Sequence, residues 1–201
     1  ARHLAGSHTC LLIDLPGHGF SNVSGTLSLE AIATGLVDIV DDLTDSSYSI
    51  IGHSAGAAIA AQMAMIRPGP IDHITSINGA FLPFRGLAGV FFSPLARGLS
   101  KMPGVAALVA WRVRSRGAME RLIESTGSQL TAEQVGSYRR RLSDPARVRA
   151  ILSMMAHWDL AGLARRLPCL TTPLLLLAAS RDRTVAPEEA EEVAQLAANA
   201  S

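Results

Sequence analysis

The sequence predicts an α/β fold, in which helices cover a mostly parallel β-sheet and a helical insertion interrupts the alternation of strands and helices. Short apolar runs that favour strands alternate with longer segments whose apolar residues recur at helical spacing. The 201 residues are 48% hydrophobic and 17% charged, a composition typical of one folded domain with a sizeable core. The third observation is a basic segment, residues 81–167, inside an otherwise acidic chain.

The first elements are a strand and a helix. The apolar run Thr9–Leu15 ends at Pro16-Gly17, which predicts a buried strand followed by a turn. Ser28 can cap a helix, because apolar residues recur at helical spacing from there to Leu43.

The next elements alternate regularly. Strands are predicted at Tyr48–Ile51, Ile71–Ile77 and Pro173–Ala179, because each is a short apolar run bounded by turn residues. A small-residue helix is predicted at Ala55–Met65. Another is expected from Pro187, with the acidic first turn that the helix dipole favours. Strands joined through helices imply a parallel sheet.

The basic segment carries helical signals instead of strand signals. Thr131 and Gln134 have the spacing of a capping box, and Asp144-Pro145 suits the start of a further helix. It holds thirteen Arg and one Lys against five acidic residues, a net charge of +9, whereas the rest of the chain carries −8. We therefore expect a sheet domain made of residues 1–80 and 168–201, with 81–167 inserted as a helical cap.

The stretch Gly52-His53-Ser54-Ala55-Gly56 has the G-x-S-x-G pattern between a predicted strand and a predicted helix. In that context the pattern indicates a nucleophile elbow, a strained turn that presents a serine. Gly52 and Gly56 meet the need for minimal side chains, and the Ala55 N–H can donate to a developing oxyanion. His53 is directed away from the place of a base. The alternative is an ordinary serine in a tight turn.

A second turn and an acid agree with this interpretation. Asp14 to Ser21 (DLPGHGFS) resembles the D-x-P-G-x-G-x-S turn of α/β-hydrolases, where the aspartate is structural. The fold implied is the α/β-hydrolase fold with an inserted helical cap. Its order of serine, then acid, then histidine makes Asp182, after the last predicted strand, the candidate acid. Asp159 is a second candidate, and Asp182 could instead be a loop cap or a solvated carboxylate.

The base is missing. Histidines occur at positions 3, 8, 18, 53, 73 and 157, and none follows Asp182. His157 could approach from the cap, but a packing or hydrogen-bonding role is favoured. The family pattern places the histidine after one more strand, and the second oxyanion donor before residue 1. We therefore expect an internal fragment, truncated at both ends and inactive by itself.

Several stretches are similar to the magnesium-chelatase accessory proteins of the BchO type, which accompany bacteriochlorophyll synthesis. This resemblance implies a role near Mg²⁺ insertion into protoporphyrin IX, a dicarboxylate. Arginine pairs bidentately with carboxylates, so Arg85, Arg112, Arg114 and Arg116 are candidate ligands, although cap arginines commonly face water. The basic cap could equally dock on an acidic chelatase subunit. The quoted stretches are SINGAFLPF (76–84), GLAG (86–89), FSPLA (92–96), ERLI (120–123), TGS (126–128), MM (154–155) and WDL (158–160).

The resemblance also implies a substrate pocket, for which the candidates are Asn78, His157, Trp158 and Arg112. His157 stands where an asparagine is expected before Trp-Asp. The predicted function is a serine hydrolase acting on an ester-like bond of a small-molecule substrate and associated with magnesium chelatase. The alternative is a non-catalytic accessory protein that binds a tetrapyrrole or a chelatase subunit.

Other function classes are disfavoured. No spacing typical of a metal site or of a phosphate-binding loop occurs, so neither a metal nor a cofactor is predicted. Acidic residues outside the cap and an aromatic content of 4% argue against a nucleic-acid partner. No apolar run approaches the ~20 residues of a membrane span. Two distant cysteines, Cys10 and Cys169, fit a reduced, cytoplasmic protein.

Overall fold

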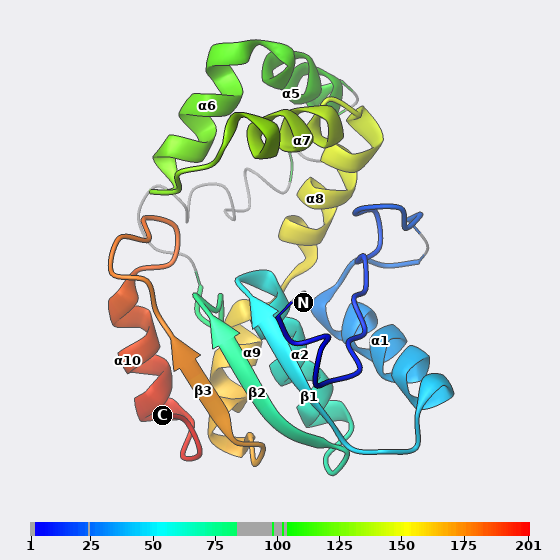
Figure 1. Cartoon of the computed structure of the whole chain (residues 1–201), viewed down its shortest axis with the longest axis vertical. Helices are drawn as coiled ribbons and strands as arrows, with labels where there is room; N and C mark the ends of the chain where they lie inside the picture. The colour runs from blue at the N-terminus through cyan, green and yellow to red at the C-terminus, as the bar shows by residue number, and fades with distance from the viewer. Residues whose placement is uncertain (1–2, 24, 84–97, 99–101, 103) are drawn as a thin grey trace.

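A computed structural model describes residues 3–23, 25–83, 98, 102 and 104–201. In this part of the chain three parallel strands form a sheet in the order β1-β2-β3. Their bounds are β1 Tyr48–His53, β2 Ile71–Ile77 and β3 Leu174–Leu177, which confirms the three strands predicted at these places. In this register Ile74 lies opposite both Ile50 and Leu174. All three carboxyl ends therefore reach the same edge of the sheet (Figure 1).

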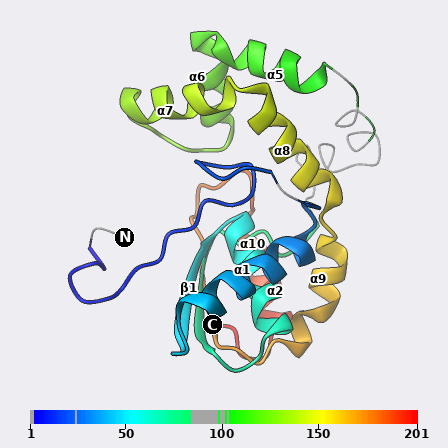
Figure 2. The ribbon, with the colours of Figure 1, turned by 90° about the vertical axis from the view of Figure 1, so that its right-hand side faces the viewer.

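Helices cover one face of this sheet. Right-handed crossovers between neighbouring parallel strands bring α2 and α9 onto the same face, and α1 packs against α2 (Figures 1 and 2). The helix α10 lies beside β3. The bounds are α1 Leu29–Leu43, α2 Ala55–Ile66, α9 Leu160–Arg166 and α10 Pro187–Leu196, and a short 3₁₀ turn, η1 (Leu167–Cys169), follows α9. Ser28 caps α1 through a hydrogen bond from the Ala31 N–H, as predicted.

The main core lies between the sheet and these helices. Alanines on α2, such as Ala57 and Ala61, are fully buried and let the helix approach the strands closely. Ile74 of β2, Leu163 of α9 and Leu174 of β3 complete the layer, each at most 1% exposed. This core carries the edge of the sheet at which the candidate catalytic residues lie.

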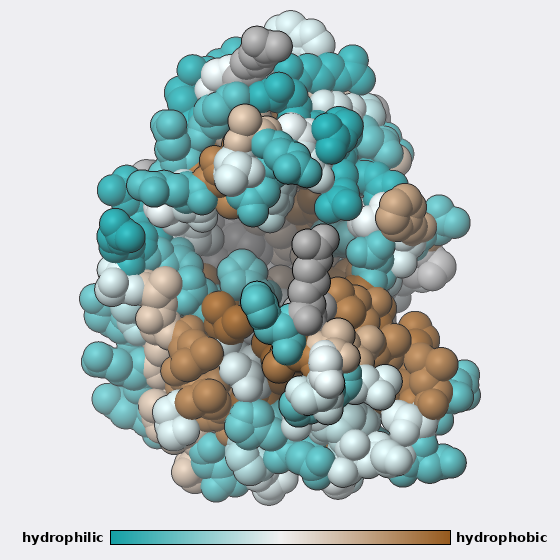
Figure 3. Space-filling model, viewed as in Figure 1, coloured by the Kyte–Doolittle hydropathy of each residue, from teal (hydrophilic) through white to brown (hydrophobic). Residues whose placement is uncertain are grey.

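The opposite face of the sheet is open in the described structure. Side chains alternate between the two faces of a strand, and the outward ones include Ile51, Ile77, Leu175 and Leu177. These four are between 36% and 56% exposed. Figure 3 shows apolar side chains gathered over the strands in this view. Burial therefore belongs to the helix-covered face alone.

The predicted strand over Thr9–Leu15 is wrong. These residues adopt no strand, and Leu11, Leu12 and Ile13 are 56%, 72% and 38% exposed. A strand is stable only when a neighbour satisfies its backbone N–H and C=O groups, and none of the described strands pairs with this segment. The apolar composition of Thr9–Leu15 favours a strand, but composition alone does not show whether a neighbouring strand is there to pair with it.

Four further helices form what we call the helical layer, which lies beyond the carboxyl ends of the strands (Figure 1). They are α5 Val105–Arg114, α6 Arg116–Ser125, α7 Ala132–Leu142 and α8 Pro145–His157. Thr131 and Gln134 form the predicted capping box of α7, and Asp144 caps α8 with Pro145 at its first turn. The division of the chain at residues 80/81 and 167/168 stays a prediction.

Candidate active site

Ser54 occupies the single residue between strand β1 and helix α2. Its backbone has φ 51° and ψ −113°, a combination that a non-glycine residue adopts only under strain of about 1–3 kcal/mol. The Ser54 N–H donates to the Ile77 carbonyl at 2.9 Å, and its carbonyl accepts from the Ala80 N–H at 3.1 Å. The strained geometry expected of a nucleophile elbow is therefore present, held by backbone hydrogen bonds from the end of β2.

The serine hydroxyl is not used by the helix that follows. Ser54 stands at the N-cap position of α2, yet its side chain makes no capping hydrogen bond. Ala55 is the first residue of α2, so its N–H has no partner within the helix and lies at the positive end of the helix dipole. A nucleophilic oxygen and a donor suited to an oxyanion thus lie on consecutive residues.

The two glycines of the elbow differ in what surrounds them. A Cβ on Gly52 would lie 2.5 Å from the Ala57 nitrogen and equally close to the Gly56 carbonyl carbon, so only glycine fits. A Cβ on Gly56 would meet no atom within 4 Å. The expected steric need is therefore correct at Gly52 and wrong at Gly56, because the described surroundings of Gly56 leave open space.

Asp182 lies in the loop after β3, as its position in the sequence predicted. One carboxylate oxygen, Oδ1, accepts from the backbone N–H groups of Thr184 at 2.7 Å and Val185 at 3.1 Å. The other, Oδ2, accepts a short hydrogen bond from the Asn78 side-chain amide. Asn78 also accepts from the Ala179 N–H at 2.8 Å. The carboxylate is thus partly buried and held by three donors.

Asn78 was predicted to line a substrate pocket, and sequence reasoning missed its contact with Asp182. The two residues are 104 positions apart, so the strand register is what brings them together. A small pocket lies beside them, lined by Ser76, Asn78, Phe81, Leu176 and Val185 among others. The Ser76 hydroxyl is buried there without a hydrogen-bond partner among the described residues.

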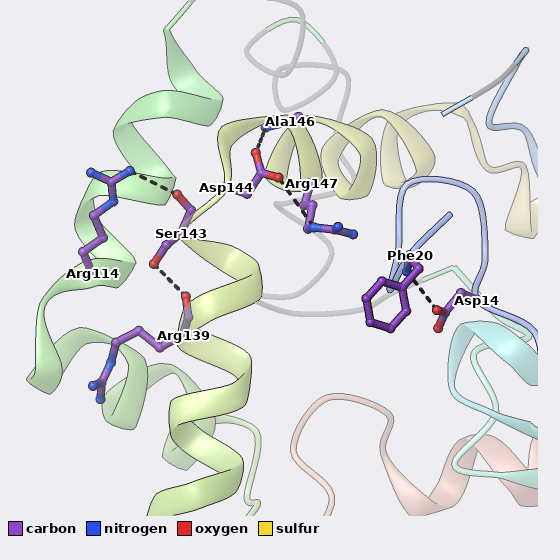
Figure 4. Close-up of polar contacts among 8 residues, drawn as sticks. All are labelled: Asp14, Phe20, Arg114, Arg139, Ser143, Asp144, Ala146 and Arg147. Atoms are coloured by element: carbon purple, nitrogen blue, oxygen red, sulfur yellow. Dashed lines mark hydrogen bonds and ion pairs between the residues drawn. The ribbon is translucent and has the colours of Figure 1, made fainter. Parts of the chain in front are cut away.

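The turn after residue 14 is structural, as expected. The Asp14 carboxylate accepts from the Phe20 N–H at 2.9 Å (Figure 4). The Ser21 hydroxyl donates to the Asp14 carbonyl at 2.7 Å. A Cβ on Gly19 would lie within about 2 Å of that carboxylate, so the turn requires glycine there. Asp14 is therefore engaged in closing its own turn.

No histidine among the described residues is hydrogen-bonded to Asp182 or to the Ser54 side chain. His53 has an exposed side chain on the open face of the sheet, and His18 binds the Pro16 carbonyl at 3.1 Å. The His157 ring bonds to the Ser153 carbonyl one helical turn earlier, at 2.7 Å. The favoured hydrogen-bonding role of His157 is therefore confirmed.

The remaining pocket candidates, Trp158 at the C-cap of α8 and Arg112 of α5, belong to different helices, and neither is hydrogen-bonded to Asp182 in the described structure. Trp158 is 6% exposed and packs in the main core, with its indole N–H unpartnered among the described residues. The exposed Asp159 caps α9 by accepting from the Gly162 N–H at 2.8 Å, which accounts for it without a catalytic role. Arg112 is exposed near the end of α5.

Three arginines of the helical layer, Arg114, Arg139 and Arg147, make side-chain contacts within that layer. Arg114 donates to the Ser143 carbonyl at 3.3 Å, and Asp144 lies 3.5 Å from Arg147 at the start of α8 (Figure 4). Arg139 pairs with Glu120 at 2.7 Å. Of the other predicted carboxylate ligands, Arg85 and the side chain of Arg116 lie outside the described residues.

Among the described residues no group of three or more His, Cys, Asp or Glu side chains is placed to hold a metal ion. Likewise, none of the helices in the described ranges is both long enough and apolar enough to cross a membrane.

Comparisons with known proteins agree with this geometry. The sequence profile of the alpha/beta hydrolase family matches residues 1–201. The chain is 36% identical to the magnesium-chelatase 30 kDa subunit of Rhodobacter capsulatus over 184 residues, which cover 90% of this chain and 64% of that protein. It is 29% identical to the pimeloyl-[acyl-carrier protein] methyl ester esterase of Methylococcus capsulatus over 194 residues, 92% of this chain and 70% of that enzyme. The chain thus spans about two thirds of the length of these relatives.

The fold matches the solved structures of other hydrolases. A hydrolase from Oleispira antarctica, olei00960, superposes with a TM-score of 0.73 at 20% identity, covering all of this chain and 73% of that one. An esterase from Exiguobacterium antarcticum superposes with a TM-score of 0.68 at 14% identity, covering 94% and 69%. At these identities the likeness establishes the fold alone.

Proposed function

The chain belongs to the alpha/beta hydrolase family, and on that premise we propose that it carries the nucleophile and the acid of a serine hydrolase that cleaves ester bonds. The observation that carries this proposal is the backbone at Ser54. A strained conformation costs stability, and a structural serine has no need of it. The strained residue Ser54 carries a hydroxyl that makes no capping hydrogen bond, and it is followed directly by the first N–H of a helix.

The proposed reaction begins at the serine. Its Oγ attacks the acyl carbon while a histidine removes its proton, and the carbonyl oxygen becomes an oxyanion that the Ala55 N–H stabilises. Collapse of this intermediate expels the alcohol, which takes the proton from the histidine. Water, activated by the same histidine, then releases the acid and restores Ser54.

The mechanism requires a histidine beside Asp182, and none of the described histidines is hydrogen-bonded to it; its two oxygens are held by Asn78, Thr184 and Val185. Asp182 is the group that orients this histidine through the N–H of its ring. By itself the 201-residue chain is therefore expected to be inactive.

An ester substrate is supported by the relatives. One of them is a methyl ester esterase, and another is a subunit of magnesium chelatase. The proposed physiological setting is the neighbourhood of magnesium chelatase in (bacterio)chlorophyll synthesis, in the cytoplasm, where a tetrapyrrole could supply the ester. The serine chemistry does not depend on that setting and is tested separately.

The test is labelling of the full-length protein with a serine-directed fluorophosphonate. We expect the wild type to be labelled and Ser54→Ala to reduce the labelling rate by at least about 10³-fold, because the nucleophile is lost. Ser49→Ala, which changes an exposed serine of strand β1, is the matched control and should label normally. Absence of labelling in correctly folded wild-type protein would refute the proposal.

A second function, carboxylate or subunit binding by the helical layer, is supported by the net charge of +9 over residues 81–167 and by the exposed Arg112. Such a layer suits an apolar dianion such as protoporphyrin IX, or an acidic chelatase subunit. Fluorescence titration with protoporphyrin IX tests it. Saturable binding that Arg112→Gln weakens, in a protein that the fluorophosphonate does not label, would favour this accessory function over hydrolysis.

A further inference from the structure

Asn78 directly follows strand β2, in a conformation that few residues adopt. Its φ of 46° is in the left-handed region, which asparagine tolerates better than most side chains. Its side-chain amide is used at both ends. The nitrogen donates to Asp182 Oδ2, and the oxygen accepts from the Ala179 N–H at 2.8 Å. One side chain thus connects the end of β2 to both sides of the acid loop.

The same turn also holds the nucleophile. We call residues 77–80 the bracing turn. The Ile77 carbonyl accepts from the Ser54 N–H at 2.9 Å, and the Ala80 N–H donates to the Ser54 carbonyl at 3.1 Å. Gly79 completes the turn, because a Cβ there would lie 2.3 Å from the Ser76 hydroxyl and 2.4 Å from the Phe81 ring. The turn is therefore tightly packed.

We propose that Asn78 is a positioning residue for Asp182, and that the bracing turn sets the nucleophile and the acid in one rigid frame. This inference rests on the proposed hydrolase function. Asn78 touches neither substrate nor base in this role. It acts through the carboxylate of Asp182, whose orientation decides where an imidazole can be held over Ser54.

The hydrogen-bond inventory of Asp182 supports this role. An ionised carboxylate only accepts, and its two oxygens offer about four lone-pair sites. Thr184 and Val185 direct their N–H groups to Oδ1, and Asn78 directs its amide to Oδ2. One lone pair of Oδ2 remains for the ring N–H of a histidine. Without the Asn78 donor, rotation of the carboxylate about its last bond is opposed only by the contacts to Oδ1.

Two substitutions separate the two functions of the Asn78 side chain, its donation to Asp182 and its acceptance from the Ala179 N–H. Asn78→Gly removes the side chain and tolerates the positive φ without strain. Asn78→Asp keeps an oxygen for the Ala179 N–H, but it replaces the NH₂ donor with a second carboxylate oxygen facing Asp182. Asn199→Gly is the matched control, because the Asn199 amide donates to the Thr171 carbonyl at 2.6 Å near the other end of β3.

The first experiment measures hydrolysis of a p-nitrophenyl ester by the full-length protein. We expect Asn78→Gly to lower kcat by about 100-fold, the scale of a 1 Å misplacement of a catalytic group, with KM unchanged. Asn78→Asp should be as slow or slower at pH 8. It should recover relative to wild type as the pH falls toward 6, because a proton shared between two carboxylates restores a donor. Asn199→Gly should match wild type.

Two outcomes of that experiment would overturn the inference. One is a kcat for Asn78→Gly within about twofold of wild type. A tenfold change in kcat corresponds to ~1.4 kcal/mol, so a twofold change would mean that loss of the Asn78 donor hardly affects the transition state. The other is wild-type activity of Asn78→Asp at every pH, which would reduce Asn78 to an anchor for Ala179. A KM effect without a kcat effect would also count against positioning.

A second measurement does not need activity. In the 201-residue chain, NMR should show one Asn78 side-chain amide proton shifted downfield by its bond to Asp182. Asp182→Ala should move that resonance upfield, and an unchanged resonance would overturn the inference. If the folded full-length wild type is not labelled by the fluorophosphonate, the proposed hydrolase function fails, and this NMR result still decides whether Asn78 holds Asp182.

Discussion

The sheet with its helices and the helical layer are built differently, although both consist of regular elements. Beneath the sheet one continuous cluster of buried side chains links α1, α2, α9, β2 and β3. Among the described residues, Ala150 and Met154 of α8 also belong to this main cluster, and the rest of the helical layer has two small clusters, one of four residues around Met119 and one of three around Ala110. Local interactions also stabilise the helical layer, among them the capping box of Thr131 and the Arg139–Glu120 ion pair.

This difference separates two requirements. Chemistry needs groups held within a fraction of an ångström, and both Ser54 and Asp182 are fixed to the end of β2, on the well-packed side. Recognition tolerates adjustment, and the basic, thinly packed layer lies above that edge of the sheet (Figure 1). The helical layer contacts the loop that carries Asp182, between β3 and α10, where the Arg183 N–H donates to the Thr126 carbonyl at 3.3 Å.

Truncation of a core side chain should have the largest effect on stability in the sheet region. Leu163 of α9 is fully buried in the main cluster, so Leu163→Ala should lower the free energy of unfolding by about 2–5 kcal/mol, through lost burial and the cavity left behind. Urea denaturation followed by circular dichroism measures this loss.

Met119→Ala, the matched truncation in the helical layer, should act locally. Its cluster is small, so hydrogen exchange should accelerate in α5–α7 while amides of β1–β3 keep their protection. Equal loss of protection in the strands would mean that the layer and the sheet unfold as one cooperative unit, contrary to the comparison drawn above.

Within the well-packed region, Gly52 and Gly56 should respond in opposite ways to substitution by alanine. Gly52→Ala should destabilise the chain by about 3 kcal/mol, the upper end for overpacking, because the new Cβ meets backbone atoms of α2 that cannot move aside. Gly56→Ala should instead stabilise it by about 0.5–1 kcal/mol, since alanine favours the helix and meets no atom within 4 Å. Thermal unfolding of the two variants checks the pair. Similar melting temperatures would contradict it.

The smallest effect is expected at Tyr48, at the start of β1. Burial raises the pKa of its phenol above the ordinary 10.0, and the nearby Asp41 adds to the rise. The folded state therefore holds the phenol proton more tightly than the unfolded state. This contribution is constant below pH 10 and is lost as pH rises through the folded pKa.

Tyr48→Phe should remove that alkaline loss. At pH 7 its stability should lie within about 1 kcal/mol of wild type, because the hydroxyl has no hydrogen-bond partner in the described structure. Urea midpoints between pH 7 and 11 test this prediction. A large loss at pH 7 would show that the hydroxyl has a partner in solution.

Much of the site could be predicted because its signals are local. The strain at Ser54 follows from a strand, a glycine and a helix within a few residues, and Asp182 follows a strand in the order that the family pattern requires. Caps such as Ser28 and Asp144 depend on neighbours two or three residues away. Each of these needs only short-range geometry, which the order of residue types specifies.

Other features depended on partners far along the chain. Thr9–Leu15 has the composition of a strand but no neighbour to pair with in the described structure. Gly56 has the same residue type as Gly52 but different surroundings. Trp158, expected in a pocket, packs into the main core.

By itself the sequence determined the α/β class, and it predicted the elbow at Ser54 and the candidate acid after the last strand. Only the tertiary structure decided that Asn78 holds Asp182 and that the turn after β2 holds Ser54 as well. The physical reason is register. Parallel pairing of β2 with both neighbours brings residues about 25 and 100 positions apart to one edge, and no local pattern encodes that distance.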